Sequence, residues 1–248
     1  MRILIIPCLL ICLLCGLKYP KALDACTRRR VLAKTDTIFI SREFDTSANN
    51  YISYHAVYIE KNRNSRFYRR RLDFNMDWDD SSLYVDNLRD LKKHFKSFRK
   101  PRAEGLPKQW LPLNLYKGKY YIYFPSEWGE EDSKVLTDST LVVTTIEGPW
   151  PQAILSLNKL NKSTWALKTY SPAWSDHAAR RITIHIINPQ SKMAVWEYMD
   201  ETGDNRYELC IPLAYAEHYD MVVNYCMQNR TGEFLFDSID YKRLLKHR

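Results

Sequence analysis

Short runs of β-branched and aromatic residues alternate with polar breaks along most of the chain. Such runs are typical of β-strands, and the breaks between them carry residues that favour turns. Regular spacing of short strands predicts a mainly β fold, either an antiparallel barrel or a β-sandwich. The predicted strands are 37–44, 51–61, 65–74, 119–124, 135–146, 153–160, 164–170, 181–187, 194–199, 207–213 and 221–226.

One segment, Asp86–Arg99, has a helical period instead. Leu88, Leu91, Phe95 and Phe98 recur at helical intervals, and the first residue of the segment is a suitable N-cap. The opposite face is basic. We interpret the segment as an amphipathic helix that packs on the sheet, and a helix lying on an anionic membrane or partner is the alternative.

The segment after this helix, 101–112, is rich in proline and predicts a linker. It separates an N-terminal portion, 26–100, which carries helix 86–99, from a C-terminal antiparallel portion, 113–248. The two portions form either two units or one domain.

The first 25 residues predict export. A single positive charge at Arg2 precedes the apolar run Ile3–Leu17, which is shorter than the roughly 20 residues that a helix needs to cross a bilayer. We expect residues 1–25 to be a signal peptide, removed after Ala25.

Cys26 becomes the first residue of the mature chain if cleavage occurs there. The sequence Leu23-Asp-Ala-Cys26 resembles the lipobox of bacterial lipoproteins, in which this cysteine is acylated and anchors the protein to a membrane. Ordinary secretion to the cell envelope, the periplasm or the medium, with an unmodified Cys26, is the alternative.

The cysteine count supports the lipid anchor. Of 6 cysteines, only Cys26, Cys210 and Cys226 remain after removal of the signal peptide, which is an odd number in an oxidising compartment. Acylation of Cys26 leaves the other two to bridge each other. If 207–213 and 221–226 pair as a hairpin, Cys210 and Cys226 lie opposite each other, within the range of a disulfide.

Charge and motifs exclude several classes of function. The net charge of +8 favours anionic lipids or acidic glycans as partners, and an exported chain is not expected to bind nucleic acid. Phosphate-binding glycine loops, zinc-ligand spacings and nucleophile elbows do not occur in the sequence, so we predict no catalytic residue, metal or cofactor. The acidic run 73–80 begins like a calcium loop, but Trp78 occupies the position where such a loop needs glycine.

Aromatic residues are abundant, at 13% of the chain. Trp128, Trp150 and Trp174 lie beside prolines in segments that we expect to be loops. A loop tryptophan can cover the end of a barrel core, or it can stack on a sugar or line an apolar pocket. These three residues are therefore the candidate ligand contacts.

Three short segments carry a resemblance to a known architecture. They are Leu115–Tyr123, Leu136–Leu141 and Val223–Cys226. The stretch 110–236 that contains them resembles uncharacterised exported proteins of bacterial envelopes with lipocalin-like barrels. The resemblance implies an antiparallel barrel and a lipid-like ligand, although the G-x-W opening typical of lipocalins is missing.

Three hypotheses for the function remain open. The first is a non-enzymatic exported envelope protein that binds an apolar or carbohydrate ligand or a partner protein. The second is a secreted hydrolase acting on glycans, with two carboxyl groups such as those at 127, 130, 131 and 132 facing the sugar. The third is a structural or adhesive surface module with a broad aromatic patch.

Overall fold

The computed structural model describes most of the chain beyond residue 36. The described ranges are 37–45, 51–95, 97–98, 100–101, 105–126, 132–145, 147–172, 179–199, 205–226 and 233–246. Residues Asp36–Arg248 form one compact unit. The predicted signal peptide and Cys26 lie outside the described residues.

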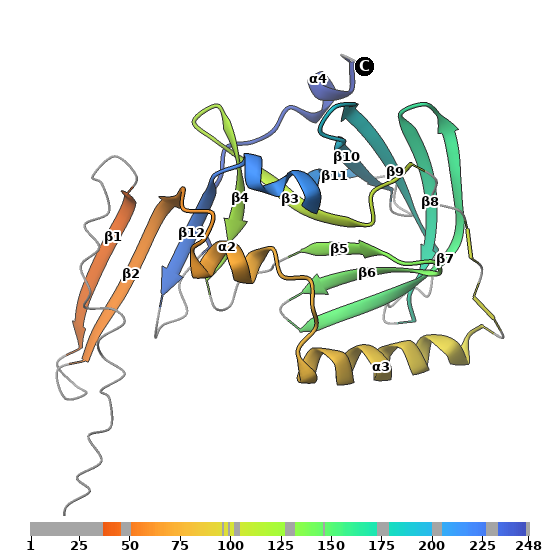
Figure 1. Ribbon diagram of the computed structural model, residues 1–248, viewed down its shortest axis with the longest axis horizontal. Helices are drawn as coiled ribbons and strands as arrows, with labels where there is room; N and C mark the ends of the chain where they lie inside the picture. The colour runs from red at the N-terminus through yellow and green to blue at the C-terminus, as the bar shows by residue number, and fades with distance from the viewer. Residues whose placement is uncertain are drawn as a thin grey trace, which may run out of the picture. The chain divides into compact units, whose positions relative to one another are not determined.

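Eight antiparallel strands close into a barrel (Figure 1). Seven of them follow one another as an up-and-down meander, and β3 closes it because it pairs with both β5 and β11. The strands are β3 (Gln109–Tyr116), β5 (Ser133–Leu136), β6 (Thr140–Thr145), β7 (Gly148–Asn161), β8 (Thr164–Tyr170), β9 (Ala179–Asn188), β10 (Met193–Met199) and β11 (Asn205–Pro212). The predicted mainly β class is confirmed, the sandwich alternative is not formed, and the barrel is compatible with a lipocalin-like fold.

The barrel interior is packed with apolar side chains. In β9 the alternation is clear: Ile182, Ile184 and Ile186 are buried, while the residues between them are less so. Trp110 and Trp196 meet edge to face in the interior, with ring centroids 5.6 Å apart. Leucine, isoleucine and tryptophan side chains from β3 and β5–β11 complete this core.

A second group of strands, the side sheet, extends from β3 away from the barrel. From Leu113 onward β3 pairs with β4 (Lys119–Phe124), and β4 pairs in parallel with β12 (Met221–Cys226). Outside these lie β2 (Tyr51–Glu60) and β1 (Thr37–Asp45). One long strand, β3, therefore belongs to both the barrel and the side sheet (Figure 1).

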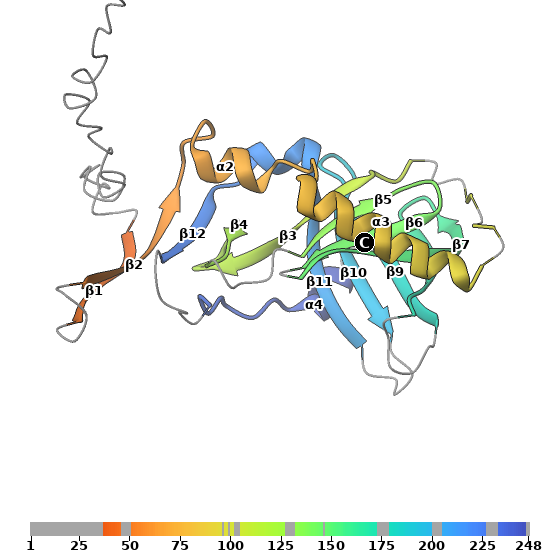
Figure 2. The ribbon, with the colours of Figure 1, turned by 90° about the horizontal axis from the view of Figure 1, so that it is seen from below.

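The main helix, α3 (Trp78–Lys93), lies across the end of the barrel formed by β5, β6 and β7 (Figures 1 and 2). Its Asn87 side chain donates to the Pro149 carbonyl at 3.1 Å. At Gly148 the contact is so close that an added Cβ would lie 2.6 Å from Leu83 Cδ2. The helix predicted over 86–99 exists, but its predicted bounds are wrong.

The acidic run explains the earlier start of α3. The Asp77 carboxylate caps the helix by accepting from the Asp80 backbone N–H at 2.9 Å, and Asp79 and Asp80 occupy the first turn. Carboxylates are favourable there because the N-terminus of a helix carries partial positive charge. The run that resembled a calcium loop is therefore a helix start.

The predicted strand 65–74 is also wrong, since α2 (Arg66–Arg71) is found in its place. Ser65 caps this short helix, and its hydroxyl accepts from the Tyr68 backbone N–H. Three consecutive arginines are good helix formers, and they outweigh the aromatic residues that suggested a strand.

The remaining segments are short. The 3₁₀-helix η1 (Leu213–His218) joins β11 to β12, and α4 (Tyr241–Lys246) lies near the C-terminus.

The predicted linker 101–112 overlaps a strand, because its last four residues are the first four of β3. None of the helices in the described ranges is long and apolar enough to cross a membrane.

Candidate ligand-binding site

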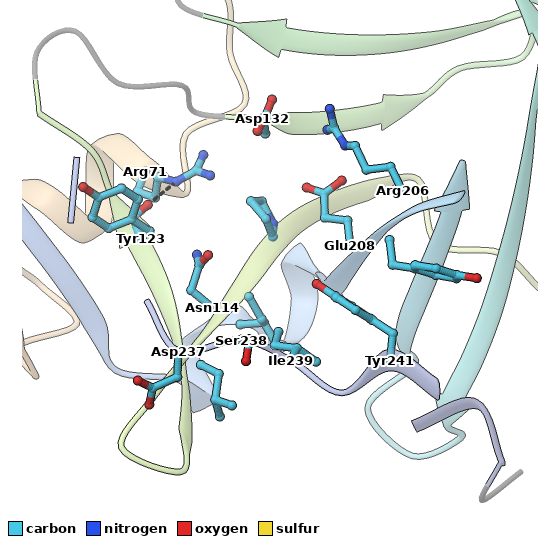
Figure 3. A pocket seen from close by; sticks show the side chains of 14 residues that line it. Arg71, Asn114, Tyr123, Asp132, Arg206, Glu208, Asp237, Ser238, Ile239 and Tyr241 are labelled. Carbon is cyan, nitrogen blue, oxygen red and sulfur yellow. Dashed lines mark hydrogen bonds between the residues drawn. The ribbon is translucent and has the colours of Figure 1, made fainter. Parts of the chain in front are cut away.

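A cavity opens where β3 leaves the barrel. β11 pairs with β3 only from Cys210 to Pro212, because β3 turns away to β4 beyond that point. The resulting space has a volume of about 460 Å³, within the range of about 300–1,000 Å³ of small-molecule sites. Figure 3 shows its lining, which comes from α2, β3, β4, the residue before β5, β11 and the C-terminal segment. We call it the junction cavity.

The C-terminal segment forms one wall of the junction cavity. The Asp237 backbone N–H donates to the Leu115 carbonyl at 2.9 Å, and its carboxylate accepts from the Lys117 N–H at 2.7 Å. Farther along, the Tyr241 ring stacks on the Tyr207 ring, with centroids 5.5 Å apart and planes 21° apart. The segment thus brings an aromatic pair to the edge of β11.

A buried ion pair lies beside this wall, inside the barrel. The Lys134 ammonium contacts one carboxylate oxygen of Glu208 at 2.8 Å, and the Tyr198 hydroxyl donates to the other oxygen at 3.0 Å. The same ammonium donates to the Asp132 carbonyl at 2.9 Å. Glu208 also lines the cavity, so its carboxylate belongs to both the core and the site.

The surroundings of this pair shift several pKa values. Burial lowers the pKa of Lys134, but Glu208 together with other neighbouring groups outweighs burial, so the pKa of Lys134 is raised. Burial, followed by the charge of Glu208, raises the pKa of Tyr198 well above its usual value. The same two causes raise the pKa of Tyr241 to about 12. Both phenols therefore remain neutral hydrogen-bond donors near neutral pH.

Two arginines contribute to the cavity in different ways. Arg71 is only 2% exposed, and its guanidinium donates to the Tyr123 carbonyl at 2.8 Å and to the Ser133 hydroxyl at 2.5 Å. Arg206 is exposed, and its guanidinium lies 5.3 Å from the centre of the Tyr198 ring. Arg71 thus ties α2 to the barrel, while Arg206 is accessible to a ligand.

The lining as a whole suits a ligand with many hydroxyl groups. Carboxylates accept hydrogen bonds from hydroxyls, guanidinium and amide groups donate to them, and an aromatic ring covers the apolar face of a sugar. The groups of these kinds in the lining are Arg71, Asn114, Asp132, Arg206, Tyr207, Glu208, Asp237, Ser238 and Tyr241.

Of the three tryptophans predicted as ligand contacts, Trp150 is within the described residues, and it does not line the junction cavity. Trp150 is half-buried and lines a separate hollow of about 320 Å³ between α3 and the start of β7, together with His94 and Pro151. Trp128 and Trp174 lie outside the described residues. The aromatic pair that lines the junction cavity is Tyr207 and Tyr241, which the sequence reasoning missed.

The predicted disulfide is not formed. Cys210 and Cys226 do not bridge each other, and the strands that carry them, β11 and β12, are separated by β3 and β4 in the strand order. The hairpin on which the prediction rested does not exist because the turn at η1 sends β12 to the side sheet. Cys210 faces the barrel core, and burial raises the pKa of its thiol well above its usual value.

The sequence reasoning also missed Lys134 and Glu208, although a charged residue within a buried strand is a recognisable signal. In β11, Glu208 is half-buried and directly precedes four buried residues, Leu209–Pro212. A charged residue at an inward position of a strand needs a partner, because an isolated buried charge is costly. Pairing it with Lys134 required knowledge that β3 lies between β11 and β5.

Among the described residues, no group of three or more His, Cys, Asp or Glu side chains is placed to hold a metal ion. Comparisons with family models, curated proteins and solved structures found no match to this chain. The interpretation of the site therefore depends on its geometry.

Proposed function

We propose that this protein is an exported binding protein of the cell envelope, and that its junction cavity binds a small carbohydrate without cleaving it. The observation that carries the proposal is the stacked Tyr207–Tyr241 pair beside hydrogen-bonding groups of both charges in a cavity of suitable size. An apolar ligand is less well supported, since apolar side chains pack the barrel interior.

Binding is favoured over hydrolysis by the contacts of Glu208. A glycosidase needs one carboxyl group free to donate a proton and a second to act as nucleophile or base. Both oxygens of Glu208 are already engaged, one by the Lys134 ammonium and one by the Tyr198 hydroxyl. This carboxylate is therefore held as a fixed acceptor.

The test is calorimetric titration of the purified chain with a panel of mono- and disaccharides. We expect Tyr241→Ala to weaken binding about tenfold, because an aromatic stacking contact contributes about 1 kcal/mol. Tyr215→Ala is the matched control, since Tyr215 lies in η1 and does not line the cavity. Absence of binding to every sugar, or equal weakening by both variants, would exclude the proposal.

A hydrolase is the second candidate, because Asp132 and Glu208 line the same cavity. It predicts release of reducing sugar from a glycan and loss of that activity in Asp132→Asn. Sugar binding with no turnover in the wild-type chain would leave the binding function as the better account.

The cellular location is part of the proposal. The apolar N-terminal run and the lipobox-like sequence before Cys26 support export followed by anchoring through an acylated Cys26. The intact mass of protein from the membrane fraction tests this, with Cys26→Ala as the control. An unmodified mature chain in the soluble fraction would exclude the anchor.

A further inference from the structure

Helix α2 covers one face of the side sheet and lies beside a second large cavity (Figures 1 and 2). This cavity has a volume of about 1,050 Å³. It is lined by α2, the ends of β4, β6 and β12, and the segment 73–80 that leads into α3, and we call it the α2 cavity. Its volume is at the upper end of the range of about 300–1,000 Å³ for small-molecule sites. It therefore has room for a ligand with two chemically different parts.

Three aromatic rings form an apolar floor in this cavity. Phe67 of α2 meets Phe124 of β4 and Tyr225 of β12 edge to face, with ring centroids 5.2 and 5.8 Å away. All three residues line the cavity and are half-buried. Rings in such a setting offer apolar area that a ligand can cover. We call these three residues the aromatic floor.

Three exposed arginines of α2 line the same cavity. They are Arg66, Arg69 and Arg70, whose spacing places them on one face of the helix. The Arg66 guanidinium lies over the Phe67 ring, 4.8 Å from its centre. The Arg70 guanidinium lies over the Phe124 ring, 5.6 Å from its centre. A contact of this kind does not use the N–H donors of a guanidinium, so those donors remain for a ligand.

Ion pairs do not balance the charges of these three arginines. Within the described ranges, none of their guanidinium groups forms an ion pair or a hydrogen bond, whereas the neighbouring Arg63 and Arg71 do. Like charges at positions i and i+4 of a helix repel each other, as at Arg66 and Arg70. An anionic group bound among the three arginines would relieve this repulsion.

Another wall of the α2 cavity is acidic, and it determines where an anion can bind. This wall consists of Asp73, Asp77 and Asp80. The Asp73 carboxylate accepts from the Asn75 backbone N–H at 3.0 Å. The Asp77 carboxylate is already engaged as the cap of α3. An anion is repelled by these carboxylates and attracted by the arginines, so its place is against α2.

We propose that the α2 cavity binds a phosphorylated amphiphile, with its phosphate at Arg66, Arg69 and Arg70 and its apolar part on the aromatic floor. A phosphate monoester suits this site better than a carboxylate, because its three free oxygens can accept from several guanidinium groups at once. The proposal is independent of carbohydrate binding, since the two cavities share no lining residue.

The first experiment is calorimetric titration of the purified chain with monododecyl phosphate, kept below the concentration at which it forms micelles. Two further probes each lack one part. Inorganic phosphate has no apolar chain, and octaethylene glycol monododecyl ether has the same chain with an uncharged head. We expect monododecyl phosphate to bind at least about tenfold more tightly than either probe, because both parts contribute contacts.

Each single-part probe can overturn the proposal. If inorganic phosphate binds as tightly as monododecyl phosphate, the aromatic floor contributes nothing. If the ether binds as tightly, the arginines contribute nothing. A series of butyl, octyl and dodecyl phosphate adds a graded test, since each methylene that covers the floor should raise the affinity by up to about fourfold. An affinity that does not change with chain length would also overturn the proposal.

The double variant Arg66→Gln/Arg70→Gln tests the phosphate contacts. We expect it to bind monododecyl phosphate at least about tenfold more weakly, because hydrogen bonds to a charged group are lost. Arg89→Gln is the matched control, since Arg89 is an exposed arginine of α3 that pairs with Asp86 and does not line the cavity. Thermal unfolding of each variant without ligand verifies that it folds. Unchanged binding in the double variant, or equal weakening in the control, would overturn the proposal.

Discussion

The barrel and the side sheet handle buried polar groups in different ways. In the barrel, the polar groups of Lys134 and Glu208 form an ion pair whose side chains are almost completely enclosed. In the side sheet, Asn224 belongs to a series of neutral hydrogen bonds that runs from His55 to Tyr123 and ends at the exposed Glu233.

Cys210 and Cys226 also differ in their surroundings. Cys210 lies within the barrel core and is 0% exposed, whereas Cys226 lies at the end of β12, beside a cavity. Every barrel strand has a neighbour on each side, whereas the side sheet ends at β1. In the barrel two buried charges hold each other, and in the side sheet the buried amide of Asn224 is held by an imidazole and a phenol. The comparison teaches that the closed barrel encloses a pair of charges, while the open sheet buries an uncharged polar group.

The largest expected effect comes from breaking the ion pair of the barrel. Glu208→Leu leaves the Lys134 ammonium buried without its partner, which destabilises by about 3–5 kcal/mol. Unfolding in urea measures the loss. The double variant Lys134→Met/Glu208→Leu should recover most of it, because it removes both charges. A single variant that loses less than about 1 kcal/mol would show that solvent reaches the pair.

Substitution of one glycine in each region compares how tightly the barrel and the side sheet are packed. Gly148 of the barrel has φ +100°, and an added Cβ would overlap Leu83 of α3, whereas Gly118 in the β3–β4 hairpin has φ +76° and open space around it. We expect Gly118→Ala to cost about 1 kcal/mol for backbone strain alone. Gly148→Ala should cost about 2–4 kcal/mol, because the overlap adds to the strain. Thermal unfolding distinguishes them, and equal costs would mean that α3 shifts freely.

A smaller effect is expected from the neutral hydrogen bonds of the side sheet. Tyr123→Phe removes the hydroxyl that joins Asn224, Phe234 and Glu233, at a cost of about 1–2 kcal/mol in the free energy of unfolding. Tyr120→Phe is a control on the same strand. An unchanged free energy of unfolding in Tyr123→Phe would show that Asn224 is held by other contacts.

The smallest effect is the contribution of Tyr241 to stability at high pH. Its folded pKa of about 12 exceeds the value of about 10 expected for the unfolded chain. A raised pKa adds stability that is complete below about pH 10 and is lost as the pH rises through about 12. Solvent screening of this partly exposed ring limits the contribution to about 1 kcal/mol. The difference in unfolding free energy between the wild type and Tyr241→Phe should therefore shrink from about pH 9 to about pH 12.

Local pattern predicted much of the fold. The bounds predicted for β4, β8 and β12 agree with the structure, since each of these strands is a short run of β-branched and aromatic residues between clear breaks. The single run predicted over 135–146 covers the last two residues of β5 and all of β6, and Thr137 lies between the two strands. β3 was missed because its proline at 112 suggested a linker.

The candidate sites were predicted less well than the strands. Trp150, predicted as a ligand contact, lines a cavity, but not the one with the stacked tyrosines. Cys226 was singled out as half of a disulfide, and the structure places it opposite His55 instead. In both cases the sequence pointed to the residue, but it did not indicate which residues the fold places beside it.

The sequence by itself determined the strand content, the antiparallel class and the presence of one main amphipathic helix. These properties depend on side-chain alternation and capping within a few residues, so they are encoded locally. Only the tertiary structure decided that β3 pairs with β5, β11 and β4, which opens the junction cavity and brings His55 to Cys226. Strand pairing joins residues that are distant along the chain and is decided by burial across the whole sheet, so a local pattern cannot specify it.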